Sequence, residues 1–261
     1  QTLSRMQIML DQIGSAGNAT SSQLLLVSNN SSDSQVTEAA RAARSTFDTM
    51  VNLLNTRIGD RAIFGGVEVD AAPLASANAM MTDIQLAIGG ATTQVAISAA
   101  INTWFDDPAG GFATMGYQGD AGPAPQKRVS ENTTLAIDAR ADDPAIKAAL
   151  KAAALAAVTH EMPALNVGTR SALLQEAGMG LFSATSGLVA VQERVGFVEE
   201  TLARTQTEMS AQSTALNIAK NDLISADPFD TASRLQAIQL QLETHYAVTA
   251  RLSQLTLLSY M

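Results

Sequence analysis

The feature that most constrains this chain is a long run of mostly apolar residues, spaced alternately three and four positions apart. The run comprises Leu181, Ala184, Leu188, Val191, Val195, Val198, Leu202, Thr205, Met209, Gln212, Leu216, Ala219 and Leu223. Such spacing places these side chains along one seam of a single helix, which would extend about 65 Å at 1.5 Å per residue. A helix of this length predicts a coiled-coil-like rod that packs on other helices or on neighbouring molecules. A helix buried in a compact bundle is the alternative.

The N-terminal part shows the same rhythm twice, on either side of the polar stretch SNNSSDS. The first set is Leu3, Met6, Leu10, Ile13, Gly17, Thr20, Leu24 and Val27, and the second is Val36, Ala40, Ala43, Phe47, Met50, Leu54 and Ile58. This pattern predicts two amphipathic helices in an up-down pair, or one interrupted helix.

The second helical pattern ends at the sequence RIGDRAIFGG, residues 57–66. Gly59 suits the C-cap of the helix, because glycine enters the left-handed conformation without steric cost. The following AIF has the length of a short strand before a Gly-Gly turn. We therefore expect a helix followed by a β-hairpin.

An insert of different texture, residues 67–167, separates the helical arms and contains six of the seven prolines. Its patterns predict helices over 76–88, 91–106 and 144–158, while KRVS and TLAIDAR predict a strand pair. The expected fold is mainly α: an elongated antiparallel helical bundle or coiled-coil-like rod with a β-hairpin, and a small α+β insert domain. The expected divisions are 1–66, 67–167, 168–226 and 227–261.

A second C-terminal helix is expected after the sequence SADPFD, where Asp227 can cap it and Pro228 fits its first turn. This helix has its own apolar stripe, which we take as the candidate assembly interface. The stripe comprises Leu235, Ile238, Leu242, Tyr246, Leu252, Leu255 and Leu258.

Composition narrows the possible partners to proteins. The 261 residues have a net charge of −9 and lack clustered Lys and Arg, which argues against a nucleic-acid groove. The most apolar stretch, 148–158, is too short to span a bilayer and predicts an alanine-rich buried helix. Because the chain starts at Gln1 within a helical pattern, we expect a natural N-terminal portion to precede it.

Motifs for catalysis or cofactors are weak. HEMPA begins like a zinc-protease helix at His160, but the position of the second histidine is Ala164. The glycine pairs match neither dinucleotide nor P-loop spacing, and the chain contains no cysteine. We expect no catalytic residue, metal or cofactor, and we expect Trp104 to be buried as the anchor of the insert.

Two heptad-patterned arms that bracket an insert resemble the flagellin superfamily. The resemblance rests on LLNTRIGDRAIFGG at the end of the first arm and on the C-terminal stretch from ADPFD to LSYM. Within that superfamily, Phe64, Gly65 and Gly66 are more typical of hook-filament junction proteins than of filament flagellin. INTWFDDPAGGFATMGYQGD and DDPAIKAALKAAALAAV in the insert are also similar to junction proteins.

The resemblance implies an extracellular structural protein of the bacterial flagellum, exported through the flagellar type III apparatus. Its implied partners are a hook-side junction protein, flagellin and further copies of itself, and an export chaperone is a further candidate. No nucleic acid, membrane or enzymatic activity is implied. Filament flagellin, an enzyme carried in the insert, and a sensory coiled coil are the alternatives.

Overall fold

The computed structural model describes residues 2–120, 122, 124, 126–130, 134–136, 139–225 and 227–258. Its elements in chain order are α1 Thr2–Leu25, α2 Asp33–Leu54, β1 Arg57–Ile58, β2 Arg61–Ala62, α3 Ala77–Ile88, α4 Gln94–Asp106, the π-helical turn η1 Phe112–Gly116, β3 Gln126–Arg128, β4 Thr134–Ala136, α5 Pro144–Glu161, α6 Val167–Ile224 and α7 Pro228–Leu258. Two compact units result, residues 1–205 and 206–261. The prediction of a mainly-α fold is confirmed.

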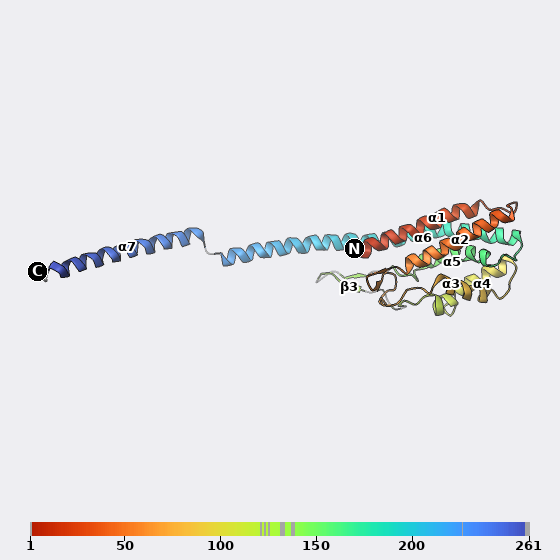
Figure 1. Cartoon of the computed structure of the whole chain (residues 1–261), viewed down its shortest axis with the longest axis horizontal. Helices are drawn as coiled ribbons and strands as arrows, with labels where there is room; N and C mark the ends of the chain where they lie inside the picture. The colour runs from red at the N-terminus through yellow and green to blue at the C-terminus, as the bar shows by residue number, and fades with distance from the viewer. Residues whose placement is uncertain are drawn as a thin grey trace. The chain divides into compact units, whose positions relative to one another are not determined.

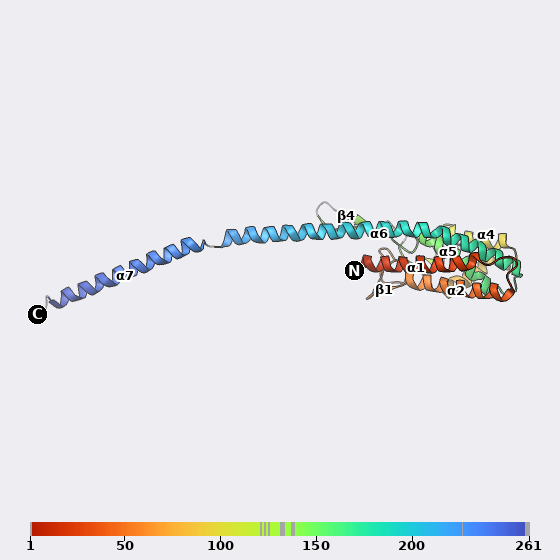
Figure 2. The ribbon, with the colours of Figure 1, turned by 90° about the horizontal axis from the view of Figure 1, so that it is seen from above.

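The first unit is built on four helices, α1, α2, α5 and α6, that lie side by side (Figures 1 and 2). Helix α2 contacts both α1 and α5. Short connections reverse the chain between α1 and α2 and between α5 and α6, so each of these pairs is antiparallel. The two N-terminal sequence patterns are therefore an up-down pair, as expected.

Helices α1 and α6 are antiparallel and joined by polar contacts along their lengths. The Ser21 hydroxyl donates to the carbonyl of Gly178 at 2.7 Å, and Gln7 Nε2 donates to the carbonyl of Gln192 at 2.7 Å. Because the earlier α1 residue bonds the later α6 residue, the two helices run in opposite directions. These bonds fix the axial alignment of α6 against the N-terminal arm.

Glycines of α6 bring it unusually close to α5. A Cβ at Gly180 would lie 2.9 Å from Cβ of Ala152, and a Cβ at Gly187 would lie 2.8 Å from Cβ of Ala145. Gly180 and Gly187 are seven residues apart in α6, and Ala145 and Ala152 are seven residues apart in α5. The two contacts therefore repeat along one antiparallel alignment of the helices. The alanine-rich helix expected over 148–158 thus exists, and it is buried among neighbouring helices that include α2 and α6.

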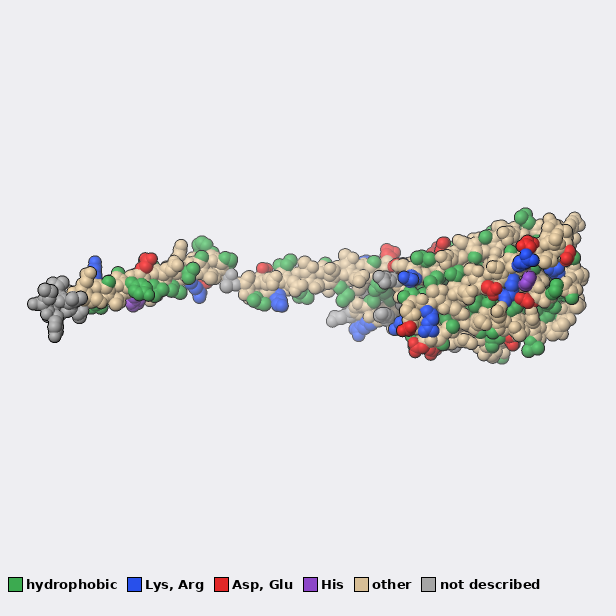
Figure 3. Space-filling view, in the orientation of Figure 1, with side chains coloured by type: hydrophobic (Ala, Val, Ile, Leu, Met, Phe, Trp, Pro, Cys, Tyr) green, Lys and Arg blue, Asp and Glu red, His purple; other side chains and the backbone are tan. Residues whose placement is uncertain are grey.

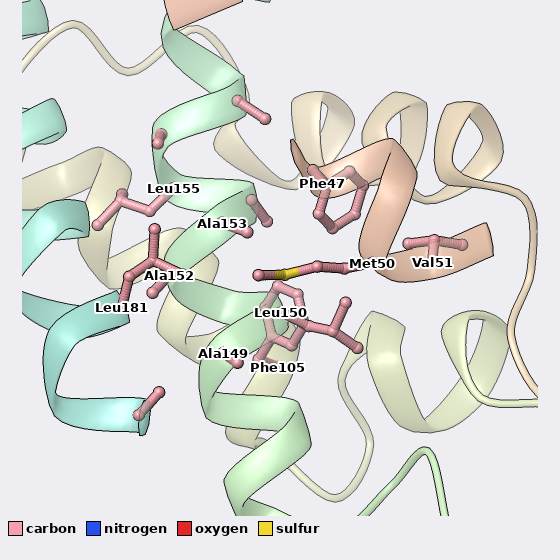
Figure 4. Close-up of a cluster of buried hydrophobic side chains, with 14 of the residues drawn as sticks. Phe47, Met50, Val51, Phe105, Ala149, Leu150, Ala152, Ala153, Leu155 and Leu181 are labelled. Atoms are coloured by element: carbon pink, nitrogen blue, oxygen red, sulfur yellow. The ribbon is translucent and has the colours of Figure 1, made fainter. Parts of the chain in front are cut away.

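The insert shares its core with the helical arms. Figure 4 shows Phe47 and Met50 of α2 beside Phe105 of α4 and Leu150 of α5. All four side chains are at most 2% exposed. The divisions proposed at residues 66, 167 and 226 remain predictions, but the insert does not pack separately from the arms.

Predicted elements of the insert are confirmed, with small shifts at their ends. Helices α3 and α5 begin after the caps Ser76 and Asp143. Helix α4 begins at Gln94 rather than residue 91, because Thr93 caps it. Strands β3 and β4 pair antiparallel in the expected hairpin, whose connecting residues 131–133 lie outside the described ranges.

Gly59 does not cap α2, contrary to the sequence prediction. The helix ends at Leu54, and Asn55 is its C-cap. Asn55 exchanges two hydrogen bonds with the backbone of Leu74, at 2.8 and 2.9 Å, and this tertiary pairing fixes where the helix ends. Gly59 instead takes its left-handed conformation in the β1–β2 turn.

The Gly65-Gly66 pair does not form the hairpin turn either. It follows the hairpin, where Phe64 is fully buried and its carbonyl accepts a bond from Ala141 N at 3.0 Å. Gly65 accepts from Asp120 N at 3.0 Å. The FGG segment therefore ties two loops of the insert to the end of the first arm.

Candidate assembly surface

The predicted apolar stripe lies on α7, within the second unit. Asp227 caps this helix as expected, since its carboxylate accepts from Phe229 N at 2.8 Å. Five members of the stripe have described side chains, and each is at least half exposed: Leu235 58%, Ile238 54%, Leu242 50%, Tyr246 73% and Leu252 58%. The side chains of Leu255 and Leu258 lie outside the described set. The stripe is thus solvent-facing within this single chain, and its assembly role remains a prediction.

Apolar exposure on α7 is not confined to the predicted stripe. Phe229, Leu240 and Val248 are 81%, 66% and 50% exposed, and they lie off the three-and-four spacing. Figure 3 shows hydrophobic side chains along the visible face of α7. A soluble monomer rarely leaves so much apolar surface on one helix, so this surface is a candidate contact for other chains.

The distal part of α6, which belongs to the same unit, continues the long heptad seam without covering it. Met209, Leu216 and Leu223 are 52%, 71% and 86% exposed. In the first unit the same seam is closed, because Leu188 and Val191 are at most 3% exposed. A single periodic pattern therefore has a buried part and an exposed part.

Near the end of the first unit the buried face shifts by one position. Leu202, which the heptad spacing predicts to be inside, is 36% exposed, whereas Thr201 is 8% exposed. Thr205 then returns to the predicted seam at 7% exposed and donates its hydroxyl to the carbonyl of Thr201 at 2.9 Å. The expectation of an unbroken apolar seam is wrong at Leu202.

Sequence reasoning missed a second apolar surface, on the outer side of α6 in the first unit. Met179, Phe182, Val189 and Phe197 are 59%, 70%, 45% and 66% exposed. They occupy helix positions outside the three-and-four spacing, which is why a search for the seam alone passed over them. Their aromatic content was the available signal.

The motif that resembled a zinc site forms part of an ion-pair network. Glu161 Oε1 lies 2.9 Å from Nε of Arg44, and Asp48 pairs with the same guanidinium. Burial alone would lower the pKa of Arg44, but these two carboxylates outweigh it and the pKa is raised. Within the described ranges, no group of three or more His, Cys, Asp or Glu side chains is arranged to hold a metal ion.

A tyrosine in the insert is electrostatically perturbed for structural reasons. Burial raises the pKa of the Tyr117 hydroxyl, and the nearby Asp142 carboxylate raises it further. The hydroxyl donates to the carbonyl of Asp120 at 3.0 Å, and Arg140 donates to the same carbonyl at 3.0 Å. These bonds hold the loop that docks on Gly65.

The described residues form a mainly α-helical fold whose C-terminal helices expose apolar side chains. Residues 181–261 match the family model of the bacterial flagellin C-terminal helical region. This match covers α6 from Leu181 to its end and all of α7, and it supports a relationship to the flagellin superfamily and a structural role in the flagellum. No curated protein matches the chain.

The matched family is structural rather than enzymatic. Among the described residues, none of the helices combines the length and the hydropathy needed to cross a bilayer.

Proposed function

We propose that this protein joins the hook of the bacterial flagellum to its filament, by self-assembling into a junction ring and contacting flagellin. The observation that carries the proposal is the C-terminal part of the chain: residues 181–261 match the flagellin C-terminal helical region, and the apolar stripe on α7 is exposed. Burial of such a stripe between subunits would contribute roughly 25 cal/mol per Å² of apolar surface.

The choice of a junction rather than a filament subunit rests on the FGG segment. Phe64 is buried. A Cβ added at Gly65 would lie 2.2 Å from the carbonyl oxygen of Glu68. Only glycine fits there without moving the backbone. The fold therefore gives a structural reason for the FGG sequence, which resembles that of junction proteins. Filament flagellin is the second candidate function, since the matched family model describes flagellin.

The proposed partners follow from this role. They are a hook-side junction protein, flagellin and copies of the same chain, with an export chaperone as a further candidate. The proposed location is extracellular, reached through the flagellar export apparatus.

The junction role is tested by deleting the gene and by counting subunits. Deletion is expected to abolish motility and to release flagellin monomers into the medium. Quantitative mass spectrometry of purified flagella is expected to find few copies of this chain beside very many of flagellin. A copy number equal to that of the filament subunit would assign the chain to the filament instead.

The assembly surface is tested with Leu242→Asp combined with Leu252→Asp. We expect loss of ring assembly and filament attachment, with the fold of residues 36–223 intact. The matched control is Gln236→Asp combined with Thr244→Asp, which adds the same charge to exposed positions off the stripe. Normal filaments from the stripe variant would show that α7 is not the assembly helix.

A further inference from the structure

The distal part of α6 and the whole of α7 have matching apolar stripes on either side of a short break. Met209, Leu216 and Leu223 repeat every seven residues before it, and Leu235 and Leu242 do so after it. All five side chains are 50–86% exposed. Two exposed apolar faces of one unit are thus joined by the same chain.

The break has the length of a helical hairpin loop. Helix α6 ends at Ile224 and α7 begins at Pro228, which leaves three residues between them. Connections of two to five residues join antiparallel helices in αα-hairpins. The chain could therefore reverse here without unwinding either helix.

Reversal about this break would place the two stripes at matching heights. The break is centred on residue 226, midway between the ends of the two helices. Leu216 lies ten residues before this centre and Ile238 twelve after it. Ala219 and Leu235 lie seven and nine residues from it. A difference of two residues is about 3 Å along a helix, less than one turn, so apolar side chains would meet apolar side chains in an antiparallel pair.

Charges beside the stripes are compatible with the same pairing. Asp222 stands one position before Leu223 in the heptad, and Arg234 stands one position before Leu235. In antiparallel coiled coils these flanking positions of the two helices face each other, and here they have opposite signs. Arg234 already pairs with Asp230 on its own helix at 3.1 Å, and both groups are exposed.

We propose that, before assembly, α7 folds back on the distal part of α6 and that the two stripes cover each other. The occupant of the α7 stripe in the isolated protein is therefore a segment of the same chain. A short linker gives this intramolecular partner an effective concentration in the millimolar range, far above that of free subunits. The shielding of the assembly surface by the closed form rests on the proposed function. The closure itself does not depend on that function.

Disulfide trapping tests the closure, because the natural chain contains no cysteine. Leu216→Cys with Ile238→Cys places one thiol on each stripe at matching heights. Thr214→Cys with Leu240→Cys is the control: both positions are exposed, equidistant from Asp227, and on the outward sides of the two helices. Each full-length variant is oxidised in a glutathione buffer at low micromolar concentration, and the products are resolved by non-reducing electrophoresis and mass spectrometry.

The stripe pair is expected to form an intramolecular disulfide about tenfold faster than the control pair. Adding Leu235→Asp to the stripe pair is expected to slow it to the control rate. Equal rates for the two pairs would overturn the proposal. Mainly intermolecular dimers would also overturn it, since a second copy would then occupy the stripe.

A separate measurement distinguishes this inference from the junction role. The oxidised stripe variant is added to flagella lacking the protein, with and without reductant. Attachment only after reduction supports shielding by the closed form. The natural chain is added in parallel, because Ile238 belongs to the α7 stripe. Rapid trapping of the stripe variant, together with no attachment of the natural chain, would leave the hairpin established and would contradict the junction role.

Discussion

The two units of this protein use the same heptad rhythm with opposite outcomes. Leu188 in the first unit and Leu216 in the second occupy the same heptad position of α6, yet they are 3% and 71% exposed. Helices α1 and α5 flank the first of these positions, and within the second unit's described residues no equivalent cover exists. Periodicity therefore specifies a helix and its apolar face, whereas burial depends on the partner.

The largest expected effect comes from introducing a charged residue at the buried one of these two positions, with the exposed one for comparison. Leu188→Asp buries an unpaired carboxylate, which costs several kcal/mol and should prevent stable folding of the first unit. Leu216→Asp should change the free energy of unfolding of the first unit by less than about 0.5 kcal/mol. Denaturant unfolding monitored by circular dichroism measures both. Similar losses from the two variants would mean that the stability of the first unit also depends on the distal seam.

Removal of the anchor of the insert is expected to have the next largest effect. Trp104 is 3% exposed, contacts Phe105 and Phe112 edge-on, and donates its indole N–H to Asp83 at 2.7 Å. Trp104→Ala should destabilise the first unit by about 3–5 kcal/mol through the cavity that it leaves. Urea unfolding followed by circular dichroism is suitable, since the variant lacks tryptophan.

Its counterpart in the second unit is Phe229→Ala, because Phe229 is 81% exposed. This variant should leave the unfolding midpoint of the first unit unchanged. An unaltered midpoint for Trp104→Ala would refute the anchoring role of Trp104.

A smaller effect is expected where α6 approaches α5. Gly180→Ala introduces a Cβ 2.9 Å from Cβ of Ala152, and overpacking of this kind costs about 1–3 kcal/mol. Adding Ala152→Gly removes the clash, so the double variant should be more stable than the two single effects predict. Thermal and denaturant unfolding of the four proteins gives the coupling energy.

The control for added methyl groups is Gly14→Ala in α1, where nothing lies within 4 Å of the new Cβ. Higher helix propensity should make that variant slightly more stable, by up to about 1 kcal/mol. If Gly180→Ala were equally stabilising, the close approach of the two helices would be disproved.

The smallest expected effect is a dependence of stability on pH. Burial raises the pKa of Tyr117 above its ordinary value of 10.0, so the unfolded chain releases this proton at a lower pH than the folded one. Above pH 10 the folded state binds more protons, and the stability of the first unit should fall as pH rises. Tyr117→Phe should flatten this decline in unfolding experiments between pH 9 and 11.

Tyr246→Phe provides the matching control, because Tyr246 is 73% exposed on α7. It should leave the decline as steep as in the natural chain. A profile unaltered by Tyr117→Phe would show that the buried hydroxyl does not contribute.

The sequence by itself determined the helices, the strand pair and the apolar faces. Local signals suffice for these features: Asp143 caps α5, Asp227 caps α7 as expected, and the three-and-four spacing marks each seam. The stripe on α7 could also be named in advance, because a helix places residues at that spacing on one side regardless of its surroundings.

Only the tertiary structure decided which of these faces are covered and where individual elements end. Asn55 ends α2 because it bonds Leu74, a residue distant in sequence. Thr201 is buried although it lies off the heptad seam, and Gly180 is required only because Ala152 lies against it. Local propensity fixes what a segment can form, whereas the packing of remote segments fixes what is buried, since burial is a property of two surfaces and not of one.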